Sequence, residues 1–135
     1  MKEFTVQAVI SNVEKVTNLV NEELELNECP IKAQMQIDIA IDELFSNIAY
    51  YAYGDQTGDA TIRIVIENDP KRVLLSFIDN GIPYNPLEKT DPNTGLTAEE
   101  REVGGLGIFI VKKSMDDMLY EYKDNQNILT IVKNI

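Results

Sequence analysis

The chain has 135 residues, of which 44% are hydrophobic, with a formal net charge of −11 and no histidine. This length suits one domain with a proper core, spanning residues 1–135, and no apolar run approaches the ~18 residues that a membrane span requires. The acidity argues against nucleic acid and anionic membranes as partners, because both select basic surfaces.

The missing histidine excludes Ser-His-Asp and Cys-His catalysis, histidine metal ligands and a phosphohistidine on this chain. Cys29 is the one cysteine, which excludes an internal disulfide and a cysteine-based zinc site. The first residues lack the long apolar segment of a signal peptide, so we expect a cytoplasmic protein. The acidity fits plain solubility, and a basic protein partner is the alternative explanation.

Alternating apolar residues predict a first strand over residues 4–10. Ser11 and Glu14 then form the capping box S-x-x-E, which predicts the start of a helix. Apolar residues at helical spacing carry this helix to Leu26.

A second helix is predicted over residues 31–53, with Pro30 at its first position. Glu43 and Asn47 stand four apart and share one face of this otherwise strongly apolar helix. Polar residues there serve either a functional site or a solvated face, and this helix alone leaves both interpretations open. The expected apolar stripe consists of Met35, Ile39, Ile41, Leu44, Phe45 and Ile48.

Strands are predicted over residues 61–67 and 73–78, joined by a turn at 68–71. The second strand ends at Asp79, and Gly81 follows closely. A carboxylate at the end of a buried strand, beside a glycine that permits close backbone approach, suits recognition of a flat polar ring. The Asn-Gly pair is also a strong hairpin-turn signal, although the prolines that follow fit a return strand poorly.

The segment 85–103 has little periodicity, and a lid over a binding site is predicted there. Gly104–Gly105–Leu106–Gly107 then opens a predicted helix that runs to Met115. Free N–H groups and the helix dipole favour phosphate at such a start, while a flexible hinge is the alternative. The pattern is neither a P-loop nor a Rossmann fingerprint, because no Gly-Lys-Ser/Thr follows and isoleucine occupies the place of the third glycine.

Two last strands are predicted over residues 118–122 and 128–132, with a turn at 124–127. The order of elements predicts an α+β fold in which helices cover one face of a mostly antiparallel sheet.

Taken together, these stretches predict a nucleotide site. Asp79 would accept the amine of adenine, and the glycine turn would bind the phosphates. Asn47 would offer an amide oxygen to Mg²⁺. Glu43, one helical turn away, would accept a proton from an attacking hydroxyl.

The boxes Glu43-x-x-x-Asn47, Asp79-x-Gly81 and Gly105-x-Gly107, in this order, resemble the N, G1 and G2 boxes of the GHKL ATPases. The resemblance covers roughly residues 4–133 and is greatest to the anti-sigma-factor serine kinases of bacterial partner switches. It implies a two-layer α/β sandwich of the Bergerat type with a mixed, mostly antiparallel sheet. It also implies ATP with Mg²⁺, and phosphorylation of serine or threonine on a small protein.

The resemblance further implies a catalytic base at Glu43 and a magnesium ligand at Asn47. The nucleotide contacts that it implies are Asn47, Asp79, Gly81, Gly104, Gly105, Leu106, Gly107 and Thr130. The implied partners are a sigma factor and its STAS-like anti-sigma-factor antagonist, with a homodimer as the assembly and neither nucleic acid nor membrane as a partner.

The chain departs from the family pattern in two places. Tyr51 stands where many members have histidine, and Val103 stands where some have an arginine, for which Arg101 is the candidate substitute. A non-enzymatic, nucleotide-gated binding module is therefore the alternative function, and the retained Glu43 favours the kinase. A histidine-kinase catalytic domain fits less well, because the chain has no histidine and only about thirty residues precede the second helix.

Overall fold

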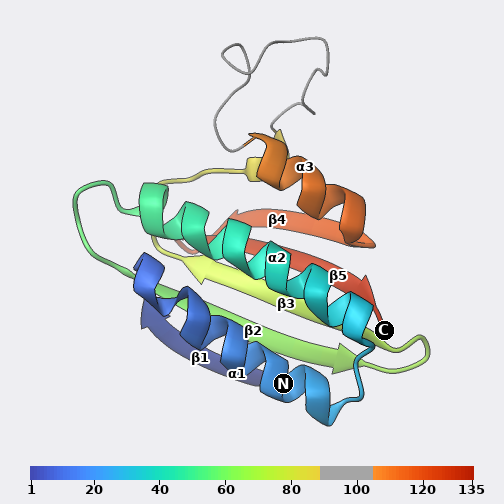
Figure 1. Cartoon of the computed structure of the whole chain (residues 1–135). Coiled ribbons are helices and arrows are strands. Elements are labelled where there is room, and N and C mark those ends of the chain that lie inside the picture. The colour runs from blue at the N-terminus through green and yellow to red at the C-terminus, as the bar shows by residue number, and fades with distance from the viewer. Residues whose placement is uncertain (89–104) are drawn as a thin grey trace.

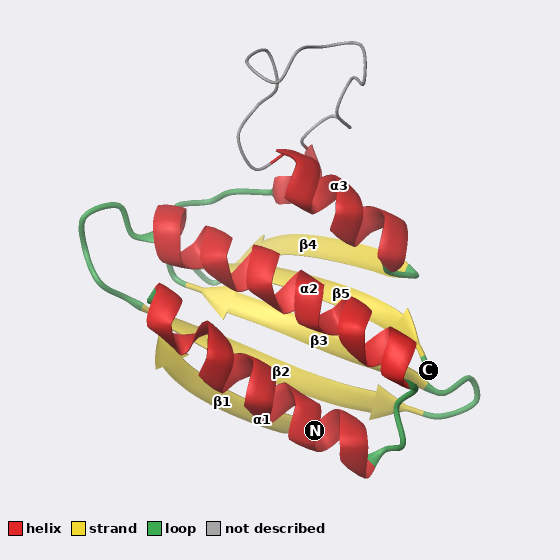
Figure 2. Cartoon of the chain, in the orientation of Figure 1, coloured by secondary structure: helices red, strands yellow, loops and turns green. Residues whose placement is uncertain are grey.

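A computed structural model of the chain describes residues 1–88 and 105–135. Within these residues, one five-stranded sheet has the order β1-β2-β3-β5-β4, and every neighbouring pair is antiparallel. All the helices lie over one face of this sheet (Figure 1, Figure 2). The elements are β1 (Lys2–Gln7), α1 (Val13–Leu26), α2 (Ile31–Asn47), β2 (Asp59–Glu67), β3 (Arg72–Asp79), α3 (Gly105–Ser114), β4 (Asp117–Lys123) and β5 (Gln126–Asn134).

The predicted α+β fold with two layers is thus confirmed. The expected admixture of parallel pairing is not found among the described strands, because each of them joins its neighbour in the opposite direction. No helix in the described part of the chain is both long enough and apolar enough to span a bilayer.

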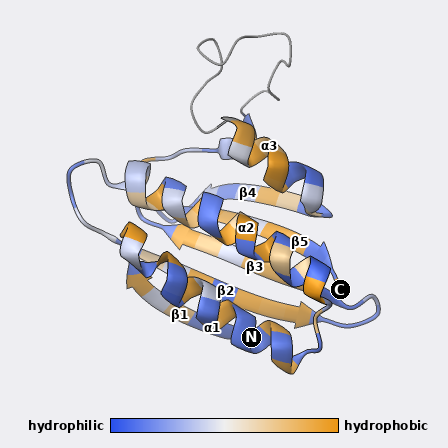
Figure 3. Cartoon of the chain, viewed as in Figure 1, coloured by the Kyte–Doolittle hydropathy of each residue, from blue (hydrophilic) through white to orange (hydrophobic). Residues whose placement is uncertain are grey.

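Inward-facing and outward-facing side chains alternate along the strands, and the inward-facing ones form the core between the two layers. Ile62 pairs with Phe77, which in turn pairs with Leu129, and all three are buried beneath the helices. The helices contribute buried residues at helical spacing, and each large apolar side chain buried in this way stabilises the fold by roughly 1.5–3 kcal/mol. The helical contributions from α1 and α2 include Val16, Val20, Leu24, Ile37, Ile41 and Leu44. Figure 3 shows the resulting alternation of hydrophobic and hydrophilic positions along both helices.

The start of α1 differs from the predicted capping box. A 3₁₀ turn over Ile10–Asn12 precedes the helix, so Asn12 rather than Ser11 is the N-cap residue, and no side chain caps the first turn. The Asn12 side chain instead donates to the carbonyl of Gln7, 2.8 Å away. This bond secures the turn between β1 and α1.

The second predicted helix consists of two parts. The α-helix ends at Asn47, and a π-helical turn continues it over Ile48–Ala52. Pro30 lies one position before its predicted place, as the N-cap residue. The expected apolar stripe was wrong at Met35 and Ile39, which are exposed because they lie on the crest of the helix, away from the sheet.

The turn of the β4–β5 hairpin is two residues shorter than predicted. Asp124 and Asn125 have φ values of 55° and 63°, the left-handed pair that a two-residue type I′ turn requires. Strand β5 therefore begins at Gln126, and Asn127 belongs to the strand rather than to the turn. This shift brings Asn127 opposite Asp79 in the ladder between β5 and β3.

Candidate functional site

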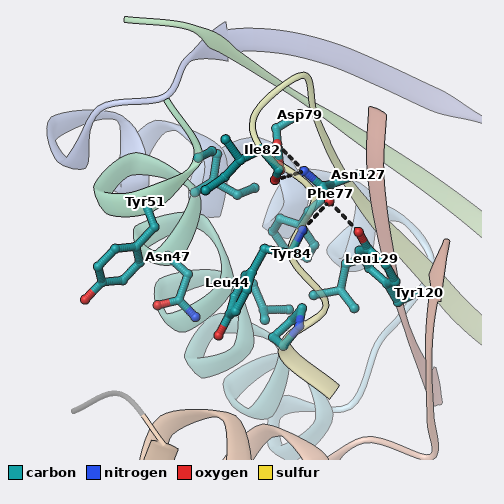
Figure 4. A pocket seen from close by; sticks show the side chains of 13 residues that line it. Leu44, Asn47, Tyr51, Phe77, Asp79, Ile82, Tyr84, Tyr120, Asn127 and Leu129 are labelled. Carbon is teal, nitrogen blue, oxygen red and sulfur yellow. Dashed lines mark hydrogen bonds between the residues drawn. The ribbon is translucent and has the colours of Figure 1, made fainter. Parts of the chain in front are cut away.

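A cavity of about 470 Å³ opens between the C-terminal end of α2 and the adjacent ends of β3, β5 and β4. This volume lies in the usual range for small-molecule sites. Figure 4 shows how the side chains from these elements surround it. The lining residues are Leu44, Asn47, Ile48, Tyr51, Ala52, Phe77, Asp79, Ile82, Tyr84, Pro86, Tyr120, Asn127 and Leu129.

Asp79 forms the polar end of this largely apolar cavity. It is the last residue of β3 and only 7% exposed. Its Oδ1 accepts hydrogen bonds from the Gly81 N–H and from Asn127 Nδ2, both at 2.9 Å. Burial raises the pKa of the Asp79 carboxyl, while these two bonds act in the opposite direction. Among the described residues Oδ2 has no hydrogen-bond donor, so that oxygen is left for a ligand.

Gly81 allows the chain to turn tightly against the end of α2. A Cβ at this position would lie 2.2 Å from the carbonyl oxygen of Ala52, and the next residue, Ile82, donates its N–H to the same oxygen at 3.0 Å. The backbone then continues along the cavity to a 3₁₀ turn over Pro86–Glu88. The hairpin-turn alternative is therefore excluded, since β3 pairs with β2 and β5 and has no return strand directly after this turn.

Tyr53 secures the same turn from the other side. Its hydroxyl accepts from the Asn80 N–H at 2.9 Å and donates to the carbonyl of Asp59. Burial raises the pKa of Tyr53, with the bond from Asn80 acting in the opposite direction. The hydroxyl thus ties the turn after β3 to the start of β2.

Glu43 lies on the side of α2 that packs against α3, and Asn47, one helical turn further along, lines the cavity. Both are half-buried, and Asn47 Nδ2 donates to Glu43 Oε1 at 3.3 Å. A Cβ at Gly107 would lie 2.3 Å from the carboxyl carbon of Glu43, so the first turn of α3 packs directly against this carboxylate. The solvated-face alternative for these two residues does not hold, because Glu43 lies against α3 and Asn47 lines the cavity.

The first turn of α3 supplies the third predicted stretch. The helix begins at Gly105, and Leu106 is 49% exposed. N–H groups at a helix start attract anions through the helix dipole. Gly104, Val103 and Arg101 lie outside the described residues. The same holds for residues 89–103, which make up most of the predicted lid.

The three predicted stretches thus meet at one place, although 64 positions separate Glu43 from Gly107. Residues 6–133 match the family model described as the histidine kinase-like ATPase domain. The chain belongs to this family. The resemblance inferred from the three boxes is thereby confirmed.

Curated relatives of this chain include proteins that are named as protein kinases. The chain is 23% identical over 103 residues to the serine/threonine-protein kinase BtrW of Bordetella bronchiseptica, a match covering 76% of this chain and 72% of BtrW. It is 29% identical over 98 residues to the serine-protein kinase RsbW of Listeria monocytogenes, covering 69% of this chain and 61% of RsbW. The RsbW of Bacillus cereus is 27% identical over 95 residues, covering 67% of this chain and 58% of that protein. The chain therefore spans about three fifths of the length of the RsbW relatives that it matches.

One residue expected from the family resemblance lies elsewhere. Thr130 is on the sheet face opposite the helices, where its hydroxyl bonds that of Ser76 at 2.7 Å. Side chains alternate along a strand, so Leu129 faces the cavity and Thr130 faces away from it. The expectation that Thr130 lies near adenine was therefore wrong, and Asn127 occupies the polar position on β5 beside Asp79.

Asn127, Tyr120, Tyr84 and Tyr53 are site residues that the sequence interpretation missed. The signal that could have found Asn127 is its pairing with Asp79, which depends on ending the hairpin turn two residues earlier, at Asn125. Tyr51, which departs from the family pattern, is 56% exposed and lies on the rim of the cavity.

A family of ATPase domains implies ATP use, and Asn47 fits a magnesium ion that accompanies the nucleotide. Mg²⁺ keeps several waters and phosphate oxygens and takes only one or two protein ligands. Asn47 lines the cavity, and its Nδ2 bond to Glu43 leaves the amide oxygen to act as such a ligand. Within the described residues, no group of three or more His, Cys, Asp or Glu side chains forms a metal site without the nucleotide.

Proposed function

We propose that this chain binds ATP in the cavity and transfers its γ-phosphoryl group to a serine or threonine hydroxyl of a small partner protein. The observation that carries the proposal is the contact between Glu43 and the first turn of α3, beside a cavity closed at its far end by Asp79. The end at Asp79 suits the adenine ring, and the end at α3 suits the phosphates. The kinase names of BtrW and RsbW support the proposal.

In this proposal Asp79 accepts the amine of adenine through its remaining carboxylate oxygen. The N–H groups of Gly105, Leu106 and Gly107, together with Gly104, bind phosphate oxygens. Asn47 would hold Mg²⁺, which when bound would neutralise part of the phosphate charge. Phosphoryl transfer asks the protein mainly for positioning and charge stabilisation, so these contacts meet most of its requirements.

Glu43 is the proposed general base. It lies between Asn47 and Gly107, the two residues that flank the expected place of the phosphates. A carboxylate there can remove the proton of an incoming hydroxyl as the new P–O bond forms. The phosphoryl group passes to that oxygen, and ADP leaves.

The proposed partners follow from the resemblance to anti-sigma-factor kinases. The phosphoryl acceptor would be a STAS-like antagonist, and the chain would also sequester a cytoplasmic sigma factor, working as a homodimer. A net charge of −11 fits protein partners with basic surfaces and disfavours nucleic acid.

The test compares wild type with Glu43→Gln, using labelled ATP and the small proteins encoded beside this one. We expect phosphate incorporation to fall by roughly 10²–10⁴-fold, the usual contribution of a general base. ATP affinity, measured by calorimetry, should change little, because Glu43 lies outside the cavity lining.

Asp42→Asn is the matched control, since Asp42 is exposed and points about 100° away on the same helix. Normal transfer by Glu43→Gln would exclude Glu43 as the base. A wild-type protein that binds a partner only with ATP, yet never phosphorylates one, would replace the kinase with a nucleotide-gated binding module.

A further inference from the structure

Asn127 uses its whole hydrogen-bonding capacity inside the protein. Its Nδ2 donates to Asp79 Oδ1 at 2.9 Å and to the Ile82 carbonyl at 2.8 Å. Its Oδ1 accepts from the Tyr84 N–H at 3.0 Å and from the Tyr120 hydroxyl at 2.5 Å. A primary amide has two donor hydrogens and two acceptor lone pairs, so no part of this side chain is left to bind a ligand.

Asn127 nevertheless lines the cavity and is only 6% exposed. Because its hydrogen bonds are used within the protein, it cannot recognise a nucleotide base directly. Its effect on a bound base therefore passes through Asp79, to which it is hydrogen-bonded and whose second oxygen has no donor among the described residues (Figure 4).

The two hydrogen bonds to Asp79 Oδ1 determine the orientation of the carboxylate. One comes from the Gly81 N–H, within the same turn, and the other comes from Asn127 on the neighbouring strand. With only the bond from Gly81, the carboxylate could rotate about its side-chain bonds. With both, Oδ2 keeps one direction.

The orientation of the Asn127 amide is determined in turn by its donors. Tyr120 lies on β4 and Tyr84 on the segment after β3, and both donate to Oδ1. A reversed amide would place Oδ1 against the Asp79 carboxylate and the Ile82 carbonyl, which are both acceptors. Burial raises the pKa of Tyr120, so its hydroxyl remains a donor at neutral pH.

A carboxylate oxygen held in one direction discriminates between purines. It accepts a hydrogen bond from the 6-amino group of adenine and repels the 6-oxo group of hypoxanthine or guanine. Buried sites built around such a hydrogen bond reject an analogue that cannot form it, because the buried group is then left unpaired.

We propose that Asn127 is a positioning residue that gives this site its preference for 6-amino over 6-oxo purine nucleotides, acting through Asp79 and itself held by Tyr120. The inference rests on the proposed ATP site, and goes beyond it by assigning base selectivity to residues that do not touch the base's polar edge.

The experiment measures the affinities of ATP and inosine triphosphate by calorimetry for wild type, Asn127→Ala and Tyr120→Phe. Wild type should bind ATP at least about tenfold more tightly than inosine triphosphate, which is the effect expected of one hydrogen bond to a charged group. Asn127→Ala should lower the ratio of the affinity for ATP to that for inosine triphosphate by roughly tenfold, chiefly by weakening the binding of ATP. Tyr120→Phe removes one hydroxyl, keeps the ring, and should lower the ratio by about threefold or more.

Asn134→Ala is the matched control, because Asn134 is exposed at the far end of the same strand. A merely structural role would weaken both nucleotides equally and leave the ratio unchanged, and that result would overturn the inference. Equal binding of both nucleotides by wild type would overturn it too, while leaving nucleotide binding intact. Absence of ATP binding by wild type would instead remove the proposed function itself. If Asn127→Ala does not fold, the ratio for Tyr120→Phe decides.

Discussion

Asp79 shows how a site residue acts against the stability of its own fold. The carboxylate is buried at the end of β3, and burial raises its pKa above the ordinary value of 3.8. The folded protein therefore holds the Asp79 proton more tightly than the unfolded chain does. By linkage, the contribution of Asp79 to the free energy of unfolding is greatest below the ordinary pKa and falls as the pH rises through the folded-state pKa.

We therefore expect Asp79→Asn to raise the thermal stability of the ligand-free protein at neutral pH. The amide keeps the shape and an oxygen for the Gly81 and Asn127 donors, and it removes the buried charge. Thermal unfolding of both proteins from about pH 4 to about pH 7 measures this, and the gap should widen as pH rises. Asp38, whose pKa burial also raises, contributes the same trend to both proteins, so the difference between them isolates Asp79. A variant less stable than wild type at pH 7 would contradict the argument.

Gly107 controls the position of Glu43. Alanine there would place a Cβ 2.3 Å from the Glu43 carboxyl carbon, and the end of that flexible side chain must then move. We expect Gly107→Ala to fold, since alanine is the best helix former, and to lower the proposed phosphoryl transfer by about 10²-fold through misplacement of the proposed base. Single-turnover transfer measures the effect, with exposed Ile110→Ala on the same helix as control. Unchanged transfer would show that the Glu43 position does not matter.

At the scale of elements, α2 has a buried face and an exposed face, and two residues that are only two positions apart lie on opposite faces. Ile37 is 1% exposed and Ile39 is 53% exposed. We expect Ile37→Ala to lower the free energy of unfolding by about 2–5 kcal/mol, because it leaves a cavity in the core. Ile39→Ala should stay within about 0.5 kcal/mol, because its side chain already contacts water. Urea unfolding compares this matched pair, and equal losses would mean that α2 packs on a different face.

The elements were largely predictable because each carries a periodic apolar pattern. The predictions failed at positions where a single residue determines the register of a strand or the buried face of a helix. The four polar residues 124–127 suit a turn by composition, yet only the left-handed conformations of Asp124 and Asn125 show where the turn lies. Met35 and Ile39 fit helical spacing, but spacing does not reveal that the buried face is already filled by Ile37 and Ile41.

At the scale of the molecule, the site forms where separate elements end together. Asp79 ends β3, Asn47 ends α2, and Gly105 begins α3 (Figure 1). The cavity, which Asp79 and Asn47 line, therefore lies at one edge of the two-layer sandwich. Ends of elements leave polar backbone groups unpaired, and these can bind a polar ligand. The sequence motifs predicted these three stretches, because glycine and carboxylate have distinctive uses there.

The supporting residues were beyond prediction from sequence, because they act through tertiary contacts. Nothing in the local sequence links Asn127 to Ile82 or Tyr53 to Asn80, and each pair meets only when the sheet has formed. Thr130 illustrates the same limit, since an error of one position in a strand moves a side chain to the other face of the sheet.

The central claim is that the cavity ending at Asp79 binds the adenine ring of ATP. Calorimetric titration of Mg-ATP into wild type, Asp79→Ala and the exposed-neighbour control Asn80→Ala tests it most directly. We expect the loss of this charged hydrogen-bond partner to cost ~1.5–3 kcal/mol, which weakens ATP binding by roughly ten- to a hundredfold, while the control binds as wild type does. An Asp79→Ala protein that is folded and binds ATP with wild-type affinity would contradict the account.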